Sequence, residues 1–374
     1  QYHKETALKL ARQGIVLLKN NDVLPLRRPK NSKNRILVTG PNANNQSILG
    51  DWHSAQPDEN VYTVFEGIKK IGTEMGYLVD YHDSNENIKR ISENDIDKTI
   101  EAAREYDLVV LVIGDNSMRY KWNQKTAGEN TARTELNLAG KQLDLVMKLK
   151  DTGKNIIVLY VNGRPISEPW ISENINAIIE LWEPGSFGGL AAAEIIFGKI
   201  NPSGKLPLTI ASSVGQLKMF YNHKHSMYFR DYAMQTNKPL YSFGFGLSYT
   251  KFDISKPKIN SSKFKKDVLS VSVKVKNIGE ISGDEVIQLY ISDKYSSITR
   301  PVKELKAFQR VSLKPGESKE ILFELNKSAF AYYDSEMNYV VEAGDFDILV
   351  GNSSRDEDLK NTNFNIEKTF YLRD

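Results

Sequence analysis

Short apolar runs alternate with helical patterns through the first part of the chain, from Arg35 to about Ile210. The runs are nearly continuous and rich in β-branched and aliphatic residues, which is typical of strands buried on both faces. We predict such strands at residues 36–39, 78–81, 108–113, 156–161, 177–181 and 206–210. Helical patterns lie between them at residues 64–75, 96–104, 138–149 and 190–197. The alternation predicts an α/β fold with a six-stranded, mostly parallel sheet covered by helices.

The residues before this alternation carry a helical pattern of their own, with apolar positions recurring from Ala7 to Leu17. We find no signal peptide ahead of this pattern. A chain that begins inside a structured element is expected when its start is truncated, processed or engineered. No run of 18 apolar residues occurs in the sequence, so we predict no membrane span.

From about Lys251 the hydrophobic pattern changes to a period of two. Leu269, Val271, Val273 and Val275 alternate with serine and lysine, as in a strand with one buried face. Further short strands are predicted at residues 285–291, 311–313, 320–325, 338–341 and 347–350. Turn-forming pairs rich in glycine and proline separate them. This part of the chain therefore predicts an all-β sandwich of the immunoglobulin or fibronectin III type.

The change of pattern divides the chain into three predicted segments. Residues 1–211 form the α/β sandwich, residues 212–250 form a connector rich in Tyr, Asn, Lys and Gly, and residues 251–374 form the β-sandwich. In open α/β sheets, ligands bind outside the carboxyl ends of the strands. The loops that follow the strands of the first segment are therefore the expected place for a functional site.

Composition excludes several classes of function. The chain has no cysteine, which rules out disulfides, thiol catalysis and cysteine-ligated zinc. Among five histidines, only His223 and His225 are close in sequence, and a solvated loop explains that spacing better than a metal site. The formal charge is +3, and no block of basic residues indicates nucleic-acid binding. We predict neither a metal nor another cofactor.

Several motifs occur in one order along nearly the whole chain, and together they are specific. They are Ala11–Asn20, Leu24–Leu26, Val38–Ala43, Leu49–Trp52, Asn162–Pro165, Asn201–Pro207, Tyr241–Thr250, Val275–Gly279 and Pro315–Ser318. The chain resembles the second and third domains of family 3 glycoside hydrolases, the α/β sandwich and the fibronectin III-like domain. The family's N-terminal (β/α)8 barrel has no counterpart in these residues, so the resemblance implies a barrel supplied in cis or in trans.

The resemblance also implies a pair of catalytic carboxylates. Retaining glycosidases use a nucleophile and a general acid/base. The family's nucleophile is a barrel Asp, so it lies outside this chain, and Asp51 is interpreted as not being the nucleophile. The segment from Gly128 to Leu138 matches the loop that carries the acid/base, which makes Glu129 the predicted catalytic residue. Arg133 is expected to orient Glu129 or to contact substrate.

Alternatives remain open for these residues. Glu129 is otherwise a solvated loop carboxylate ahead of a helix, and Glu135 is a rival placed at the entry of that helix. Trp52 matches a position where the family places a sugar-stacking tryptophan, or it is a structural aromatic. Trp122 extends the sugar platform or is an exposed lid residue, within a stretch at residues 119–125 that is longer than the family usually has. Arg164 is interpreted as structural.

The favoured hypothesis is the C-terminal portion of a retaining, exo-acting β-glycosidase. The resemblance implies hydrolysis of terminal, non-reducing β-D-glucosyl or xylosyl residues from a β-linked oligosaccharide or glycoside, with little activity in the absence of the barrel. It also implies a periplasmic or secreted location. The alternative is a non-catalytic carbohydrate-binding or interaction module. Another type of α/β hydrolase is disfavoured, because the sequence has no GxSxG nucleophile elbow.

Overall fold

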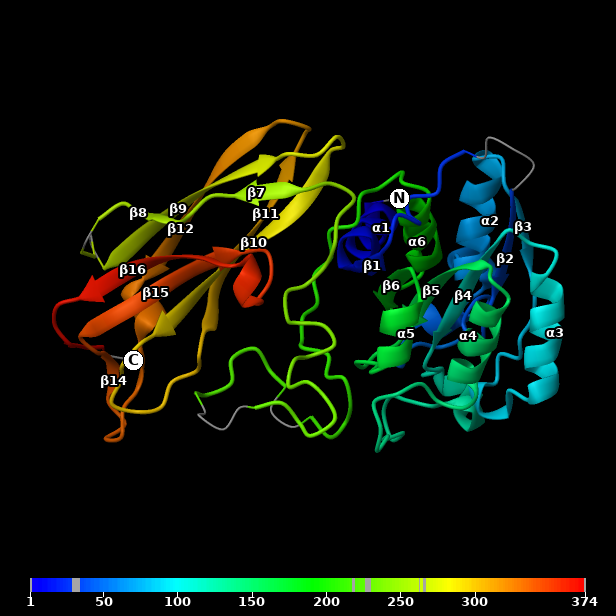
Figure 1. The fold of residues 1–374 in the computed structure, drawn as a ribbon, viewed down its shortest axis with the longest axis horizontal. Coiled ribbons are helices and arrows are strands. Elements are labelled where there is room, and N and C mark those ends of the chain that lie inside the picture. Colours follow the sequence, from blue (N-terminus) through cyan, green and yellow to red (C-terminus); the bar gives the residue numbers. More distant parts are fainter. Residues whose placement is uncertain are drawn as a thin grey trace. The chain divides into compact units, whose positions relative to one another are not determined.

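A computed structural model describes residues 2–28, 34–216, 219–225, 230–261, 263–264 and 267–372. The chain divides into two compact units, which are seen in Figure 1. The first unit comprises Gln1–Gly204, Ile210–Gln216 and Gly246–Tyr249, and the second comprises Lys205–Thr209, Leu217–Phe245 and Thr250–Asp374. The predicted connector at residues 212–250 is thus shared between the units. One reason is that Leu206 and Phe245 are joined by a backbone hydrogen bond of 2.8 Å, which places both segments in the second unit.

The first unit contains the predicted six-stranded sheet, with strand order β1-β6-β5-β4-β2-β3. The strands are β1 (Val16–Asn20), β2 (Arg35–Thr39), β3 (Leu78–Tyr81), β4 (Leu108–Gly114), β5 (Asn155–Val161) and β6 (Ala177–Trp182). The five strands from β6 to β3 are parallel to their neighbours. Strand β1 runs antiparallel to β6, so the sheet is mixed. The α/β class and a six-stranded sheet are confirmed, and five of the six predicted strand positions match.

One of the six strands was placed wrongly by the sequence pattern. Residues 206–210 form no strand of the sheet. Residues 16–20 form its edge strand β1, although Val16 and Leu17 belong to the predicted helical pattern. Pro207 has no backbone N–H to donate to a neighbouring strand, which explains the first difference. In β1, Val16–Leu18 are buried against β6, and this packing decides the conformation of a short apolar run that fits either pattern.

Helices cover both faces of this sheet (Figure 1). They are α1 (Tyr2–Gly14), α2 (Val64–Glu74), α3 (Glu93–Ala103), α4 (Gln142–Asp151), α5 (Pro169–Asn174) and α6 (Gly188–Ile196). Val110 and Val112 of β4 share one core with α1, α2 and α6, while the intervening Val109 and Leu111 are buried on the other face. Burial on both faces explains why β4 reads as a continuous apolar run.

Local sequence signals fix the ends of several helices. Thr63 with Glu66 and Ser92 with Asp95 form capping boxes at the starts of α2 and α3. The helix predicted to begin at residue 138 begins only at Gln142. Gly140 explains the delay, because its φ of +61° is incompatible with a right-handed helix, and a Cβ there would lie 2.3 Å from the Ile88 carbonyl oxygen.

The second unit is an antiparallel β-sandwich, as predicted. Its larger sheets have the strand orders β11-β10-β15-β16 and β12-β9-β7, with β8 paired to β9, and β13-β14-β17 form a small third sheet. The strands are β7 (Phe252–Ile254), β8 (Lys258–Ile259), β9 (Val268–Asn277), β10 (Gly283–Asp293), β11 (Glu304–Leu313), β12 (Ser318–Asn326), β13 (Tyr332–Tyr333), β14 (Tyr339–Val341), β15 (Gly344–Gly351), β16 (Lys360–Ile366) and β17 (Phe370–Tyr371). Residues 269, 271, 273 and 275 all face the core, which confirms the period-two pattern.

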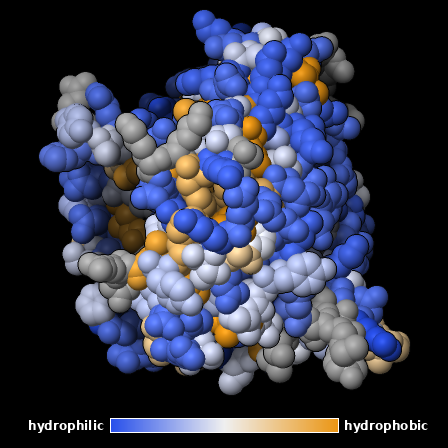
Figure 2. Space-filling view, turned by 90° about the vertical axis from the view of Figure 1, so that its left-hand side faces the viewer, coloured by the Kyte–Doolittle hydropathy of each residue, from blue (hydrophilic) through white to orange (hydrophobic). Residues whose placement is uncertain are grey.

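Short 3-10 turns join many of these elements. They are η1 (Gln46–Leu49), η2 (Asp58–Asn60), η3 (Ile88–Arg90), η4 (Arg119–Gln124), η5 (Lys327–Phe330) and η6 (Asp356–Asp358). No helix within the described ranges is both long enough and apolar enough to cross a bilayer. The face drawn in Figure 2 is mostly hydrophilic, and its apolar residues form small groups interrupted by polar ones.

Candidate active site

The predicted site residues lie on two loops at the carboxyl edge of the first unit's sheet. Glu129 is in the loop after β4, and Trp52 is in the loop after β2. Strands β2 and β4 are parallel neighbours, so the two loops leave the sheet side by side. The structure therefore brings Trp52 and Glu129 into one region at the edge where α/β sheets bind ligands.

The backbone of Glu129 is held by two side chains. Its N–H donates to Oδ2 of Asp51 at 2.5 Å, and its carbonyl oxygen accepts a hydrogen bond from Nζ of Lys125 at 3.1 Å. Lys125 Nζ also lies 2.8 Å from Oδ1 of Asp51. Burial raises the pKa of Asp51, but the hydrogen bonds from Lys125 and from the Glu129 N–H outweigh it and hold this pKa below its usual range. Asp51 thus serves the loop as an ionised anchor.

The Glu129 side chain faces solvent, and Arg119 forms an ion pair with it. Its Oε2 accepts a hydrogen bond from Nη1 of Arg119 at 2.5 Å, and the Glu129 side chain is 42% exposed. Arg119 also stacks on Trp52, with its guanidinium carbon 3.9 Å from the ring centroid. The carboxylate is therefore accessible to solvent, and the arginine that it binds stacks on the ring of Trp52.

Arg133, expected either to orient Glu129 or to contact substrate, contacts Asn137 in the structure. Its Nη2 donates to the backbone oxygen of Asn137 at 3.1 Å, and Arg119 takes the position next to Glu129. Arg119 and Lys125 were not among the residues predicted to contact the Glu129 loop. The available signal was the unusual length of residues 119–125, which form η4 and its C-terminal cap.

The two candidate platform aromatics are exposed. Trp52 is 76% exposed and Trp122 is 47% exposed, and the guanidinium of Arg119 lies within 5.9 Å of the Trp122 ring centroid. Exposed tryptophans beside a carboxylate form the type of surface on which the apolar face of a sugar ring stacks. Glu135, the rival acid/base, is exposed in an irregular segment and does not begin a helix, because α4 starts seven residues later.

Glu183, in the loop after β6, is a further carboxylate near this region. It accepts a hydrogen bond from the Ser117 hydroxyl at 2.8 Å, and it packs so closely on Gly50 that a Cβ there would lie 2.7 Å from Oε2. Burial raises the pKa of Glu183, and the charges of Asp51 and Asp115 act in the same direction. Glu183 belongs to none of the motifs or predicted site residues named above, and its proximity to Gly50 and Ser117 is visible only in the folded chain.

Arg164 holds the other end of the Glu129 loop. It forms a close ion pair with Asp115, 2.8 Å from Nε to Oδ2, and donates to the backbone oxygens of Leu136 and Asn137 at 3.1 and 3.0 Å. The Asp115 side chain is 2% exposed. Arg164 therefore ties the loop to the end of β4, in agreement with the structural role expected from the sequence.

Glu180 of β6 is a buried acid that gives the unit a pH-dependent stability. Burial raises its pKa to about 8, although the Trp182 N–H donates to its Oε1 at 2.8 Å. The unfolded chain ionises this group near pH 4.5 and the folded chain near pH 8. The stabilisation is therefore complete below about pH 4.5 and is lost as the pH rises towards 8, at up to about 1.4 kcal/mol per pH unit.

We expect Glu180→Gln to flatten this dependence, because glutamine keeps the shape and an acceptor for the Trp182 N–H but has no ionisation to lose. Urea denaturation at pH 5.0 and 7.5 measures the difference, with Glu101→Gln, an exposed helix residue, as the control. If the free energy of unfolding fell equally with pH in the parent chain and in Glu180→Gln, Glu180 would not be the source of the pH dependence.

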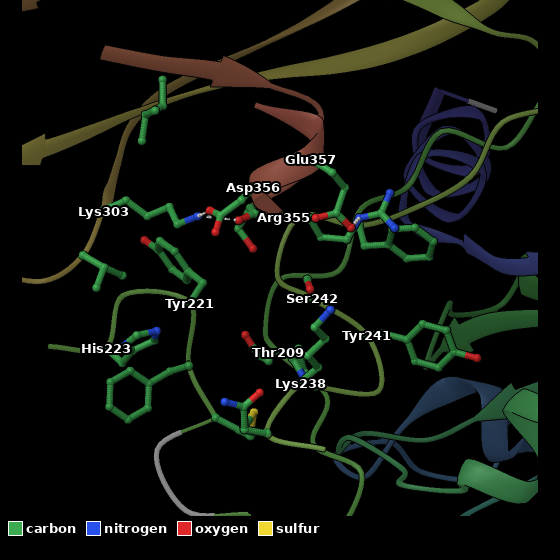
Figure 3. Close-up of a pocket in the computed structure, with 18 of the residues that line it drawn as sticks. Thr209, Tyr221, His223, Lys238, Tyr241, Ser242, Lys303, Arg355, Asp356 and Glu357 are labelled. Atoms are coloured by element: carbon green, nitrogen blue, oxygen red, sulfur yellow. Dashed lines mark hydrogen bonds and ion pairs between the residues drawn. The ribbon is translucent and has the colours of Figure 1, made fainter. Parts of the chain in front are cut away.

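A separate cavity of about 860 Å³ lies within the second unit (Figure 3). His223 and His225, the pair considered for a metal, line it together with aromatic residues such as Tyr221 and Tyr241. Lys303 donates to the Ser354 carbonyl at 2.8 Å and pairs with Asp356. Charged lining residues of both signs are present: Lys238, Lys303, Arg355, Asp347, Asp356 and Glu357. The lining therefore favours neither a cation nor an anion.

Comparisons with known families agree with both units. The model of the glycosyl hydrolase family 3 C-terminal domain matches residues 15–249, and that of a fibronectin type III-like domain matches residues 285–354. The first match contains the loops that carry Trp52 and Glu129. The second lies within the β-sandwich.

Individual proteins are similar over nearly the whole chain. A beta-xylosidase of Formosa agariphila is 38% identical over 98% of this chain and 50% of its own length. A periplasmic beta-glucosidase of Salmonella typhimurium is 35% identical, over 93% of this chain and 48% of its own length. A crystal structure of beta-glucosidase from Listeria innocua superimposes with a TM-score of 0.88 at 31% identity, covering 99% of this chain and 50% of that one. The chain thus spans about half the length of the curated relatives it matches.

Proposed function

The chain belongs to glycosyl hydrolase family 3, and on that premise we propose that it is the C-terminal portion of a retaining, exo-acting β-glycosidase. The proposed substrates are β-linked oligosaccharides or glycosides with a terminal, non-reducing glucosyl or xylosyl residue. Support for this range comes from relatives named beta-glucosidase and beta-xylosidase. Because the match to these named glycosidases extends over nearly the whole chain, a non-catalytic binding module is not favoured.

The observation that carries the proposal is the position of Glu129. It is a solvent-facing carboxylate on a fixed backbone, at the carboxyl edge of the sheet and beside exposed tryptophans. As a general acid, Glu129 donates its proton to the departing glycosidic oxygen while the nucleophile attacks the anomeric carbon. As a general base, it then takes a proton from the water that hydrolyses the glycosyl-enzyme.

The nucleophile in this proposal is an aspartate of a (β/α)8 barrel that these residues do not include. Retaining enzymes place their two carboxyl groups roughly 5–5.5 Å apart, so the barrel must close over the loop edge that holds Glu129. The barrel is provided in cis or by a partner chain. Trp52 and Trp122 would stack on the sugar accepted from that side, and Arg133 would contact its polar groups.

Arg119 would have to move when substrate binds. Its guanidinium now stacks on Trp52 and holds the Glu129 carboxylate, so a sugar on that ring face and Arg119 compete for the same surface. Glu129 also has to leave this ion pair to reach a glycosidic oxygen. We propose a periplasmic or secreted location, which the periplasmic relative supports.

We expect the chain alone to release no p-nitrophenol from p-nitrophenyl β-glucoside or β-xyloside above the uncatalysed rate, because one of the two required carboxylates is absent. Joining the family's barrel to this chain should restore hydrolysis, and NMR of the first-formed sugar should show the β-anomer. Turnover by the chain alone that survives Glu129→Ala would contradict the proposal. The α-anomer as first product from the joined enzyme would contradict the retaining mechanism.

A further inference from the structure

The backbone N–H and the backbone carbonyl oxygen of Glu129 both form hydrogen bonds with the Asp51–Lys125 ion pair. The N–H donates to Asp51, the carbonyl oxygen accepts from Lys125, and Asp51 and Lys125 are 2.8 Å apart. Asp51 comes from the loop after β2, whereas Lys125 follows η4 in the loop after β4. Two loops that are far apart in sequence therefore meet on the backbone of a single residue.

Burial of the ion pair makes this arrangement rigid. The Lys125 side chain is 1% exposed and that of Asp51 is 14% exposed, whereas the Glu129 side chain is 42% exposed. A buried ammonium group is costly unless its charge and its N–H groups are satisfied. Lys125 satisfies this condition with Asp51, the Glu129 carbonyl oxygen and the Trp122 ring, whose centroid is 4.6 Å from Nζ. Displacing Asp51 would leave the buried charge of Lys125 unpaired, and displacing the Glu129 carbonyl oxygen would cost the ammonium group a hydrogen bond.

The preceding residue is adapted to the same contact. Gly128 has a φ of +99°, and a Cβ at this position would lie 2.7 Å from Oδ2 and 2.9 Å from Cγ of Asp51. Any larger residue would push the carboxylate away from the Glu129 N–H. The requirement for glycine therefore follows from the close approach of Asp51 as well as from the backbone conformation.

We propose that the Asp51–Lys125 ion pair positions Glu129 by fixing its backbone without holding its carboxylate, whose partner is Arg119. Asp51 and Lys125 touch no substrate in this proposal and act only through Glu129. The expected effect on catalysis rests on the acid/base function proposed above for Glu129, whereas the restraint of the Glu129 backbone does not depend on that function. The long segment at residues 119–125 then has a role in positioning Glu129, because it contains Lys125.

The backbone part is tested on the chain as it is. In the double variant Asp51→Leu/Lys125→Met, both charges and both side-chain partners of the Glu129 backbone are removed and the side-chain sizes are roughly kept, so no buried charge is left unpaired. We expect hydrogen exchange in a peptide covering residues 126–132, followed by mass spectrometry, to become at least about tenfold faster at Glu129, as expected when a buried hydrogen-bonded backbone is released. Exchange of the β4 core should stay unchanged, which shows that the fold is intact.

Lys121→Met is the matched control for the exchange experiment. Lys121 lies in η4, the turn that Lys125 follows. It pairs with Glu86, 2.7 Å from Nζ to Oε1, rather than with Glu129 or Asp51. We expect its exchange at residues 126–132 to equal that of the parent chain. Unchanged exchange in the double variant, with β4 intact, would overturn the positioning role.

The catalytic part is tested in the enzyme joined to its barrel. The double variant should lower kcat on cellobiose about 10- to 100-fold, with little change in KM, because a displaced acid still permits binding. The loss in kcat/KM, which reports formation of the glycosyl-enzyme, should be smaller on 2,4-dinitrophenyl β-glucoside than on cellobiose, because dinitrophenolate leaves without a proton. Lys121→Met should behave as the parent on both. Faster exchange with unchanged kinetics would overturn the catalytic consequence but leave the backbone role standing. A fully active Glu129→Ala enzyme would instead overturn the proposed function.

Discussion

Replacing Glu129 by alanine in the barrel-joined enzyme is expected to reduce kcat on cellobiose by about 10²- to 10⁴-fold, the usual contribution of general acid–base catalysis. The reason is the poor leaving group, a sugar hydroxyl that must be protonated as it departs. For 2,4-dinitrophenyl β-glucoside, formation of the glycosyl-enzyme should be nearly normal, because dinitrophenolate leaves without a proton. Steady-state and pre-steady-state kinetics on the two substrates measure the contrast.

A small anion provides a second readout of the same substitution. Azide needs no general base, so it should react with the glycosyl-enzyme of Glu129→Ala and yield the β-glycosyl azide, identified by NMR. Glu135→Ala, an exposed residue in the same loop, serves as the control and should leave both substrates unaffected. If Glu129→Ala slowed formation of the glycosyl-enzyme equally on both substrates, the acid/base assignment would be contradicted. If Glu135→Ala instead slowed this step on cellobiose alone, Glu135 would be the acid/base.

Arg164→Ala is expected to lower the free energy of unfolding of the chain by about 3–5 kcal/mol, the range seen when one partner of a buried ion pair is removed. The substitution leaves the Asp115 carboxylate, 2% exposed, without its cation, and it also removes the donors to the Leu136 and Asn137 carbonyl oxygens. Urea denaturation of the 374-residue chain measures the loss through the midpoint and slope of the first unit's transition.

Two further variants separate the buried charge from general damage. Arg104→Ala removes an exposed pair with Glu101 and should change the unfolding free energy by less than about 1 kcal/mol. Arg164→Met/Asp115→Asn removes both charges and should recover most of the stability lost in Arg164→Ala. An effect of Arg164→Ala as small as that of Arg104→Ala would show that the pair with Asp115 does not stabilise the fold.

Strands with an unambiguous pattern could be predicted from the sequence. Leu108–Ile113 is continuously apolar, which predicts a strand buried on both faces. Val268–Lys276 alternates between apolar and polar residues, which predicts a strand with one buried and one exposed face. Residues 16–20 and 206–210 are short apolar runs without such a pattern. Their conformations were decided by neighbours distant in sequence, β6 for the first and Phe245 for Leu206.

The sequence by itself determined the class of each unit, the family, and the loops that hold Glu129 and Trp52, because apolar periodicity and ordered motifs are local properties of a chain. The partners of those residues were decided only by the tertiary structure. Asp51 reaches the Glu129 N–H across 78 positions, and Arg119 rather than Arg133 forms the ion pair with the Glu129 carboxylate. The physical reason is that an ion pair or hydrogen bond depends on the distance between atoms in space, which the folding of two strand-end loops against each other sets and no local pattern encodes.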